Sequence, residues 1–319
     1  MLRTPFCELL DVEAPILQAA IWPATSPELV AAVSDAGAIG TIAGIFSTAD
    51  GLRGQIERVR ALTDRPFVVN HVISTLDEDA FQATLDARPA AVSFALGDPG
   101  ALVERAHAAG AKVIHQVHTV AQAREAAALG VDVVIAQGSE AGGQGMAAGV
   151  GTMALVPQVV DAVAPIPVLA AGGIADGRGL AAALALGAAG VNVGTRFLAS
   201  EEASTEEGWK QAIIDAESED TVRFETWGAI VPPPAPGAYN VAPRVIRTEF
   251  VSQWESRPDE AAGESERLLA EIMAAVGEGR THEILPFTGQ TAGLIRDVQP
   301  AAKIVKNLVA EAERAVELG

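Results

Sequence analysis

The sequence contains very little cysteine and few aromatic residues. Cys7 is the one cysteine among 319 residues, so no disulfide can form within the chain. Aromatic residues account for 4% of the chain, although apolar residues together account for 49%. Small and branched aliphatic residues therefore supply the core, and side chains of this size let helices pack closely against a sheet. We expect an α/β protein in which Cys7 is a small apolar residue without chemistry.

Positive charge is also scarce. The chain has 22 lysine and arginine residues against 41 aspartate and glutamate residues, which gives a formal net charge of −19. Such a chain repels nucleic acid and anionic lipid, so we expect neither a nucleic-acid nor a membrane partner. An anionic ligand would have to be bound mainly by backbone N–H groups.

Long apolar runs are missing as well. No run reaches the roughly 18 to 20 residues that a membrane span needs. The first residues, MLRTPFCELLDVEAPI, contain acids and no long apolar core, unlike a signal peptide. No H-E-x-x-H, C-x-x-C or Walker motif is present, so we expect no metal site. These absences predict a cytoplasmic protein that acts on a small molecule. The sequence does not decide whether the protein forms a homodimer.

A pattern of short apolar runs followed by amphipathic, alanine-rich stretches repeats along the first 200 residues. Near-continuous apolar runs that alternate with helices indicate parallel strands buried on both faces. The predicted strands are Pro15–Ala20, Ala38–Gly44, Pro66–Asn70, Ala91–Gly97, Lys112–Val117, Val131–Gln137, Pro167–Gly172 and Gly190–Thr195.

Helix start and stop signals separate these runs. Ser26 is a cap residue followed by Pro27 and Glu28, and Gly37 stands where the helix should end. The same device is predicted at Asp98-Pro99 with Gly110, at Thr119 with Gly130, and at Asp176 with Gly187. Each predicted helix therefore fills one interval between two strands.

Eight successive β/α units predict a (β/α)₈ TIM barrel. The alternative, an open doubly wound sheet, carries G-x-G-x-x-G after its first strand, whereas the first strand here ends without glycine. From about Ser204 the alternation stops. We predict a barrel over residues 1–203, a mostly helical cap or substrate subdomain over 204–286, and a C-terminal segment, 287–319, that packs back on the barrel.

Glycine-rich turns follow the seventh and eighth predicted strands. Gly172 and Gly173 end the seventh strand, and the eighth runs through Asn192 and Val193 into Gly194 and Thr195. Glycine lets the backbone approach a ligand closely, and barrels commonly bind phosphate at these two strand ends. One such turn alone would be an ordinary tight turn. Two of them at neighbouring strand ends predict a phosphate site.

The loop after the sixth strand reads Gln-Gly-Ser-Glu-Ala-Gly-Gly-Gln-Gly-Met over residues 137–146 and is predicted to be flexible or closely approached by a ligand. Together with Phe67–Asn70, Ala170–Asp176, Asn192–Phe197 and Gly289–Leu294, this loop resembles the nitronate monooxygenase (2-nitropropane dioxygenase-like) family and the related FMN-dependent enoyl-acyl-carrier-protein reductases. The resemblance covers nearly the whole barrel and the C-terminal segment.

The resemblance implies FMN as the cofactor. It places flavin contacts at Ala20, Asn70, Gln116, Gln137, Gly142, Gly143, Gly172, Gly173, Asn192, Val193, Gly194 and Thr195. Amides suit a neutral flavin ring, whereas N–H donors and a hydroxyl group suit a phosphate dianion.

The sequence departs from the family at its proposed catalytic histidine, because Gln144 stands there. An amide cannot act as a general base near neutrality. A lysine found in the fifth strand of another branch is also replaced, by Gln116. His71 and His118 are candidate replacements for the base, since His71 follows Asn70 and His118 shares a strand face with Gln116. For any single histidine, a structural role is more common than a catalytic one.

The resemblance implies oxidation of a small substrate such as an alkyl nitronate, with O2 or another electron acceptor. A nitronate has already lost its proton, so an enzyme without the base could still oxidise it. The first alternative is an NAD(P)H-dependent reductase of quinones or activated alkenes. The second is a flavin-binding barrel with little catalysis.

Overall fold

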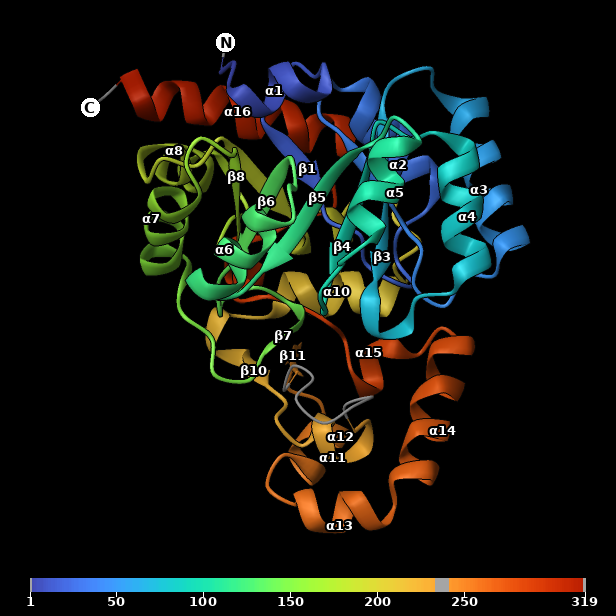
Figure 1. The fold of residues 1–319 in the computed structure, drawn as a ribbon. Helices are drawn as coiled ribbons and strands as arrows, with labels where there is room; N and C mark the ends of the chain where they lie inside the picture. Colours follow the sequence, from blue (N-terminus) through green and yellow to red (C-terminus); the bar gives the residue numbers. More distant parts are fainter. Residues whose placement is uncertain (1, 233–240, 318–319) are drawn as a thin grey trace.

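The computed structural model describes residues 2–232 and 241–317. A barrel forms one lobe, a smaller helical lobe lies beyond one of its ends, and both chain termini lie at the opposite end (Figure 1). The TIM-barrel class predicted from the sequence is confirmed by eight parallel strands with helices between them.

The barrel strands agree closely with the eight predicted runs. They are β1 (Ile16–Gln18), β2 (Gly40–Ala43), β3 (Phe67–Val72), β4 (Ala91–Ala95), β5 (Lys112–Val117), β6 (Val133–Gln137), β8 (Val168–Ala171) and β9 (Gly190–Val193). Their order in the sheet is β1-β9-β8-β6-β5-β4-β3-β2. A parallel bridge between Leu17 and Ile39 brings the two edge strands together and nearly closes the barrel.

Side-chain caps begin most of the helices around the barrel. These helices are α1 (Pro5–Leu10), α2 (Pro27–Asp35), α3 (Ala49–Leu62), α4 (Glu78–Ala87), α5 (Leu102–Ala108), α6 (Val120–Ala128), α7 (Thr152–Val163), α8 (Gly177–Ala185) and α9 (Thr195–Leu198), with the 3₁₀ turn η1 (Ile73–Thr75) before α4. The side chains of Ser26, Thr119 and Asp176 accept N–H bonds as predicted. The predicted cap at Asp98 is wrong: α5 begins three residues later than predicted, and the Asp98 carboxylate accepts from Gly100 in a local turn instead.

Two apolar layers fix where the barrel can be hollow. Aliphatic side chains on the outer face of the sheet pack against the surrounding helices. Inside the barrel, Leu17, Val68 and Ile114 pack with Phe6 of α1, which closes the amino-terminal end of the strands. The interior can therefore open only at the carboxyl-terminal end.

The segment after α9 builds the smaller lobe and returns to the barrel. Its elements are α10 (Glu207–Asp215), η2 (Ser218–Asp220), β10 (Thr221–Arg223), α11 (Trp227–Ile230), β11 (Val241–Ile246), α12 (Glu249–Trp254), α13 (Pro258–Gly263), α14 (Ser265–Gly277) and α15 (Thr281–Ile284). Phe224, Val245, Trp254 and Leu268 are central to its own apolar core. We call residues 204–286 the insertion.

The loop after β6 contains a strand that the sequence analysis missed. Residues Gly143–Met146 form β7, which pairs antiparallel with β11 in the three-stranded sheet β10-β11-β7. Gln144 lies opposite Pro243, and Met146 lies opposite Val241. A glycine-rich segment has no strand periodicity, so this strand depends on its partner rather than on its own sequence. The predicted loop is therefore held to the insertion along part of its length.

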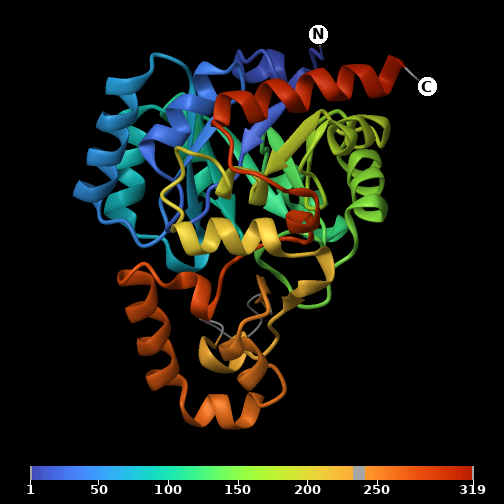
Figure 2. The same ribbon diagram turned by 180° about the vertical axis from the view of Figure 1, so that it is seen from behind.

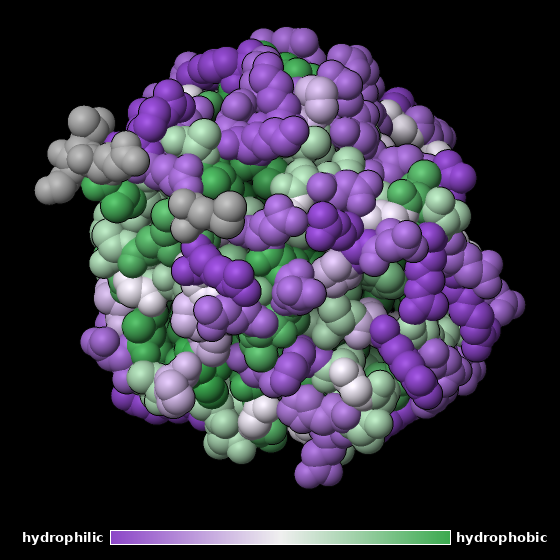
Figure 3. All heavy atoms as spheres, turned by 90° about the horizontal axis from the view of Figure 1, so that it is seen from above, coloured by the Kyte–Doolittle hydropathy of each residue, from purple (hydrophilic) through white to green (hydrophobic). Residues whose placement is uncertain are grey.

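The end of the chain packs back on the barrel. After η3 (Gln290–Leu294), helix α16 (Ala301–Glu317) lies against α8 and α2, and Figure 2 shows it running across the end of the barrel. The backbone N–H of Gly177 donates to Glu311 at 3.0 Å. Hydrophilic side chains cover much of the face seen from this end, with smaller apolar areas between them (Figure 3). None of the helices in the described residues is long and apolar enough to cross a membrane.

Candidate flavin and substrate site

A cavity of about 640 Å³ lies between the carboxyl-terminal ends of the barrel strands and the insertion. Its floor is formed by the strand ends and the loops that follow them. Its roof is formed by α11, α14, α15 and the segment that leads to η3. This is the end of a barrel at which active sites are found.

The floor collects nearly every residue that the sequence analysis selected. The predicted residues that line the cavity are Ala20, Asn70, Gln116, Gln137, Gly142, Gly143, Gln144, Gly172, Gly173, Asn192, Gly194 and Thr195. Val193 does not line it, because successive strand residues face opposite sides and Val193 packs in the core outside the barrel. The predicted contacts from six different strand ends are thus brought to one surface.

Two buried polar atoms on this floor have no hydrogen-bond partner among the described residues. They are Oδ1 of Asn192 and Oγ1 of Thr41, and both residues line the cavity. A buried polar group without a partner costs free energy, so such atoms indicate a polar ligand. The Asn70 amide nitrogen donates to Ser93, which leaves its oxygen for the cavity. This donor and acceptor set fits the polar edge of a flavin ring.

The glycine turns form a cradle beside these amides. Gly172 and Gly173 have φ angles of +97° and +76°, a conformation that side-chain-bearing residues rarely adopt. A Cβ atom at Gly172 would lie 2.9 Å from the backbone nitrogen of Ala141. Thr195 accepts from the Gly289 N–H at 3.0 Å, and its own hydroxyl hydrogen remains available to a ligand. The cradle fits a phosphate group.

The loop after β6 is fixed by charged residues that the sequence analysis did not select. The Glu140 carboxylate accepts from the Thr152 backbone at the start of α7, at 2.9 Å from each oxygen. The Ser139 carbonyl accepts from Arg223 at 2.7 Å and from Arg244 at 3.0 Å, both from the insertion. Burial lowers the pKa of Arg223 to about 10, with Arg244 adding to the effect. The loop is therefore anchored to α7 and to the insertion.

The same loop crosses the chain that returns from the insertion. A Cβ atom on Gly142 would lie 2.5 Å from the Gly289 nitrogen, and one on Gly289 would lie 2.7 Å from the Gly142 nitrogen. The Gln290 N–H also donates to the Glu140 carbonyl at 3.0 Å. Both glycines are required because the two backbones touch. The sequence motif at residues 289–294 thus has a structural reason as well as a place beside the cavity.

Gln144 lies on the cavity surface, where its amide can donate and accept hydrogen bonds. Its backbone carbonyl accepts from the Gln137 side chain at 3.0 Å, which links the two residues. Among the described residues that line the cavity, Glu140 alone has an acidic or basic side chain, and its carboxylate is already bound to Thr152. The cavity therefore offers no free general base.

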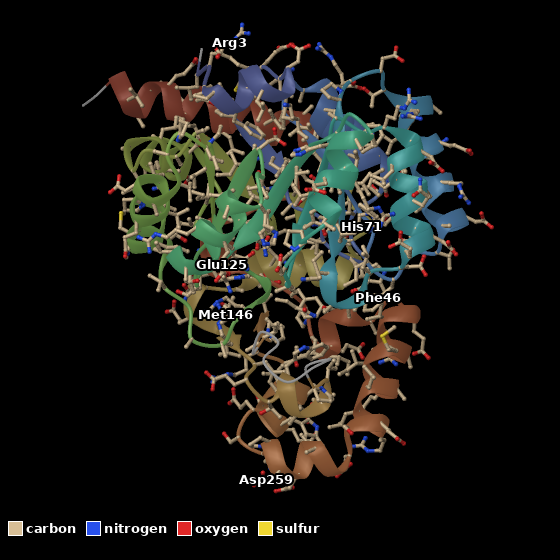
Figure 4. The ribbon with its side chains drawn as sticks, in the orientation of Figure 1. Arg3, Phe46, His71, Glu125, Met146 and Asp259 are labelled. Carbon is tan, nitrogen blue, oxygen red and sulfur yellow. The ribbon has the colours of Figure 1, made fainter. Side chains whose placement is uncertain are left out.

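His71 and His118 are not on the cavity surface. His71 points from β3 toward α4, where its Nε2 lies 2.8 Å from the Thr84 hydroxyl and its ring packs edge-on against Phe81. Figure 4 shows it on the barrel, away from the insertion. His118 is 3% exposed, and both of its ring nitrogens lack partners within the described part of the chain. This placement does not support either histidine as the replacement base.

Burial lowers the pKa of His71 to about 4 and that of His118 also to about 4, with Arg223 contributing at His118. An unfolded histidine titrates near 6.5, so the unfolded chain binds protons that the folded chain does not. We therefore predict that the free energy of unfolding falls by up to about 1.4 kcal/mol per pH unit for each histidine as pH drops from 6.5 toward 4. Urea titrations across this range should show a shallower slope in His118→Gln. An unchanged slope would contradict a neutral buried His118.

The roof of the cavity is apolar. Trp227 of α11, Ile272 and Val276 of α14, Leu285 after α15, and Phe287 line it from the insertion. From the barrel side, the loops after β1 and β2 add Trp22, Ile45 and Phe46. These residues were not predicted as site residues, because their sequence neighbourhoods read only as a helical cap or a loop.

Comparisons with known proteins agree with this geometry. The family model for nitronate monooxygenase matches residues 3–84 and 77–311. A probable nitronate monooxygenase of Staphylococcus saprophyticus is 33% identical over 98% of this chain and 98% of its own length. A (3aS,4S,5R,7aS)-5-hydroxy-7a-methyl-1-oxo-octahydro-1H-indene-4-carboxyl-CoA dehydrogenase of Mycobacterium tuberculosis is 39% identical over 80% of this chain and 69% of its own.

Two solved structures resemble the whole chain. FabK from Thermotoga maritima has a TM-score of 0.89 and 36% identity, and the match covers 99% of this chain and 98% of FabK. A nitroalkane oxidase from Streptomyces ansochromogenes has a TM-score of 0.86 and 29% identity, with 98% and 99% covered. With its cavity, its glycine cradle and these matches, the chain belongs to the nitronate monooxygenase family of flavin-dependent oxidoreductases.

Proposed function

We propose that this protein binds FMN and oxidises alkyl nitronates with O2. The observation that carries the proposal is a cavity whose floor presents amides, hydroxyl groups and a glycine cradle but no free general base. A nitronate has already lost the proton that such a base would remove. The family match and the similar nitronate monooxygenases support the same substrate class.

Some residues of the cavity would bind the cofactor and others would bind the substrate. Gly173, Gly194 and Thr195 would hold the phosphate, and Asn70 with Asn192 would bond the polar edge of the ring. When bound, FMN supplies the capacity to take two electrons from the substrate and pass them to O2. The Gln144 amide would donate a hydrogen bond to a nitronate oxygen, and the apolar roof would exclude water.

A second function, reduction of an activated alkene or quinone at the expense of NAD(P)H, is favoured by the apolar side chains of the roof and by the similarity to FabK. In that case Gln144 would bond the carbonyl oxygen of the acceptor. No base is needed to withdraw a proton from carbon in this direction either, so the floor fits both reactions.

Anaerobic mixing separates these functions. We expect the flavin absorbance to bleach rapidly with ethyl nitronate and slowly, if at all, with NADH or NADPH. Rapid bleaching by a reduced nicotinamide and none by nitronate would replace the first proposal with the second. Bleaching by neither reagent would mean a flavin-binding barrel with little catalysis.

The purified protein is predicted to be yellow and to release FMN rather than FAD when it is heated. The reason is one glycine cradle at β8 and β9, without a dinucleotide-binding fingerprint. Chromatography of the released chromophore measures this directly. A colourless protein or a released FAD would contradict the assignment of the cradle.

A further inference from the structure

We infer that the upper part of the cavity receives a long, uncharged hydrocarbon group, and that the substrate carries no nucleotide group such as that of CoA. The inference rests on the proposed function only in placing the reacting end of the substrate on the polar floor. Above that floor, the walls are the indoles of Trp22 and Trp227 with aliphatic side chains from α14 such as Ile272 and Val276. An ethyl or propyl group would leave most of this apolar surface uncovered.

The apolar surface continues to the outside of the protein. Phe46 is 60% exposed, Leu269 is 38% exposed and Met273 is 45% exposed, and all three line the cavity. Phe46 lies at the junction between the barrel and the insertion (Figure 4), and it lines the same cavity as residues of α14. Exposed apolar residues that continue an apolar cavity mark a binding surface rather than an ordinary surface. The entrance is therefore suited to an extended apolar chain.

The entrance offers no unpaired lysine or arginine of the described residues to bind phosphate groups. No lysine or arginine of the described residues lines the cavity. On the α14 side, Arg267 is paired with Glu264 and Glu271, and Arg280 is paired with Glu278 and Glu283. Residues 264–283 contain five acids and two arginines, a net charge of −3.

In α3, the helix that follows Phe46 in the chain, Arg53 is paired with Asp50. Arg223 and Arg244 direct their N–H groups at backbone carbonyls instead of the cavity. A polyphosphate group at this entrance would meet repulsion from the acidic surface without a compensating cation. In this respect we expect the chain to differ from the M. tuberculosis relative, whose name gives a CoA thioester as its substrate.

Chain length should decide affinity for the holoenzyme. In a series from ethyl to octyl nitronate, we expect KM to fall about fourfold for each added methylene while kcat changes little, as burial of apolar area predicts. A KM that does not change from ethyl to octyl would overturn the inference even if every nitronate is oxidised.

A matched pair of surface variants locates the effect. Leu269→Gln places an amide on the proposed entrance, whereas Leu294→Gln makes the same change at a leucine that is 48% exposed and does not line the cavity. We expect the octyl-to-ethyl ratio of kcat/KM to fall several-fold in Leu269→Gln and to stay at the wild-type value in Leu294→Gln. An equal octyl-to-ethyl ratio of kcat/KM in the two variants would mean that the hydrocarbon group of the substrate does not bind at Leu269.

Equilibrium binding, measured without turnover, tests whether the site recognises a nucleotide group on the ligand. Trp22 and Trp227 line the cavity, so tryptophan fluorescence reports its occupancy. We expect ethyl octanoate to bind at least as tightly as octanoyl-CoA, and 1-octanol to bind more tightly than 1-butanol. If octanoyl-CoA bound at least tenfold more tightly than ethyl octanoate, and this difference in affinity decreased as salt was raised, the site would bind a nucleotide group and the inference would be wrong.

These readouts keep the two proposals apart. If the nitronates are not oxidised but 1-octanol and ethyl octanoate bind with the expected order, the reaction proposed above is wrong and the hydrocarbon site stands. If nitronates are oxidised without any dependence on chain length, the reaction stands and the hydrocarbon site is wrong.

Discussion

Gly173→Leu is expected to lose at least nine-tenths of its bound flavin while remaining folded. Gly173 lies in the cradle at the end of β8 with φ +76°, and it lines the cavity where the phosphate is proposed to bind. The nearest atom to a Cβ there would be Cβ of Glu140, at an ordinary contact distance of 3.8 Å, so the protein itself has room for it. The side chain would instead occupy the space of the ligand. The measurement is the ratio of flavin absorbance to protein absorbance after purification.

Gly130→Leu is the matched control for this experiment. Gly130 also has a positive φ, +81°, a Cβ atom there would have nothing within 4 Å, and the residue lies after α6, away from the cavity lining. Both substitutions therefore carry a similar backbone cost of about 1 to 2 kcal/mol. Flavin retained in Gly130→Leu and lost in Gly173→Leu assigns the loss to the ligand site. Equal loss in both would mean that general destabilisation, and not the cradle, is responsible.

Gln144→His is expected to raise the rate on neutral nitroalkanes by about 10² to 10⁴ fold, the usual effect of a positioned general base. Gln144 lies on the cavity surface in β7, where its backbone is fixed by pairing with Pro243 of β11. The nitronate rate should change far less, because that substrate needs no proton removal. Steady-state oxygen consumption with both forms of the substrate measures the two effects.

The pH profile distinguishes a base from a change of shape. In Gln144→His the nitroalkane rate should rise with pH through the histidine pKa, near 6.5 for an unperturbed ring, since only the neutral ring accepts a proton. Gln144→Asn, which introduces no base, should show no such gain. Wild-type protein that already oxidises nitroalkanes as fast as nitronates would mean that another group supplies the base, although His71 and His118 do not line the cavity.

Much of the barrel could be predicted from the sequence because its signals are local. Each strand is a short aliphatic run, and caps such as Ser26 and Thr119 act within their own helix turn. The carboxyl ends of parallel strands all lie at one end of a barrel. Residues as far apart as Asn70 and Thr195 could therefore be assigned to one floor without knowing any contact between them.

Other features depended on contacts between distant segments. β7 is a strand only because β11, about 100 residues later, pairs with it. Arg223 and Arg244 reach the Ser139 carbonyl from the insertion, and neither arginine belongs to a motif. The side of the sheet on which a histidine lies was also decided by tertiary packing, which directs His71 toward Thr84 and away from the cavity.

The sequence by itself determined the barrel, the glycine cradle and the replacement of the family histidine by Gln144, because each of these features depends on residues that are close together in the chain. Only the tertiary structure decided what lies above the floor. The apolar roof combines Trp22 and Phe46 from barrel loops with Ile272 from α14. Helical periodicity shows that α14 has an apolar face, but it cannot show whether that face covers a core or a ligand.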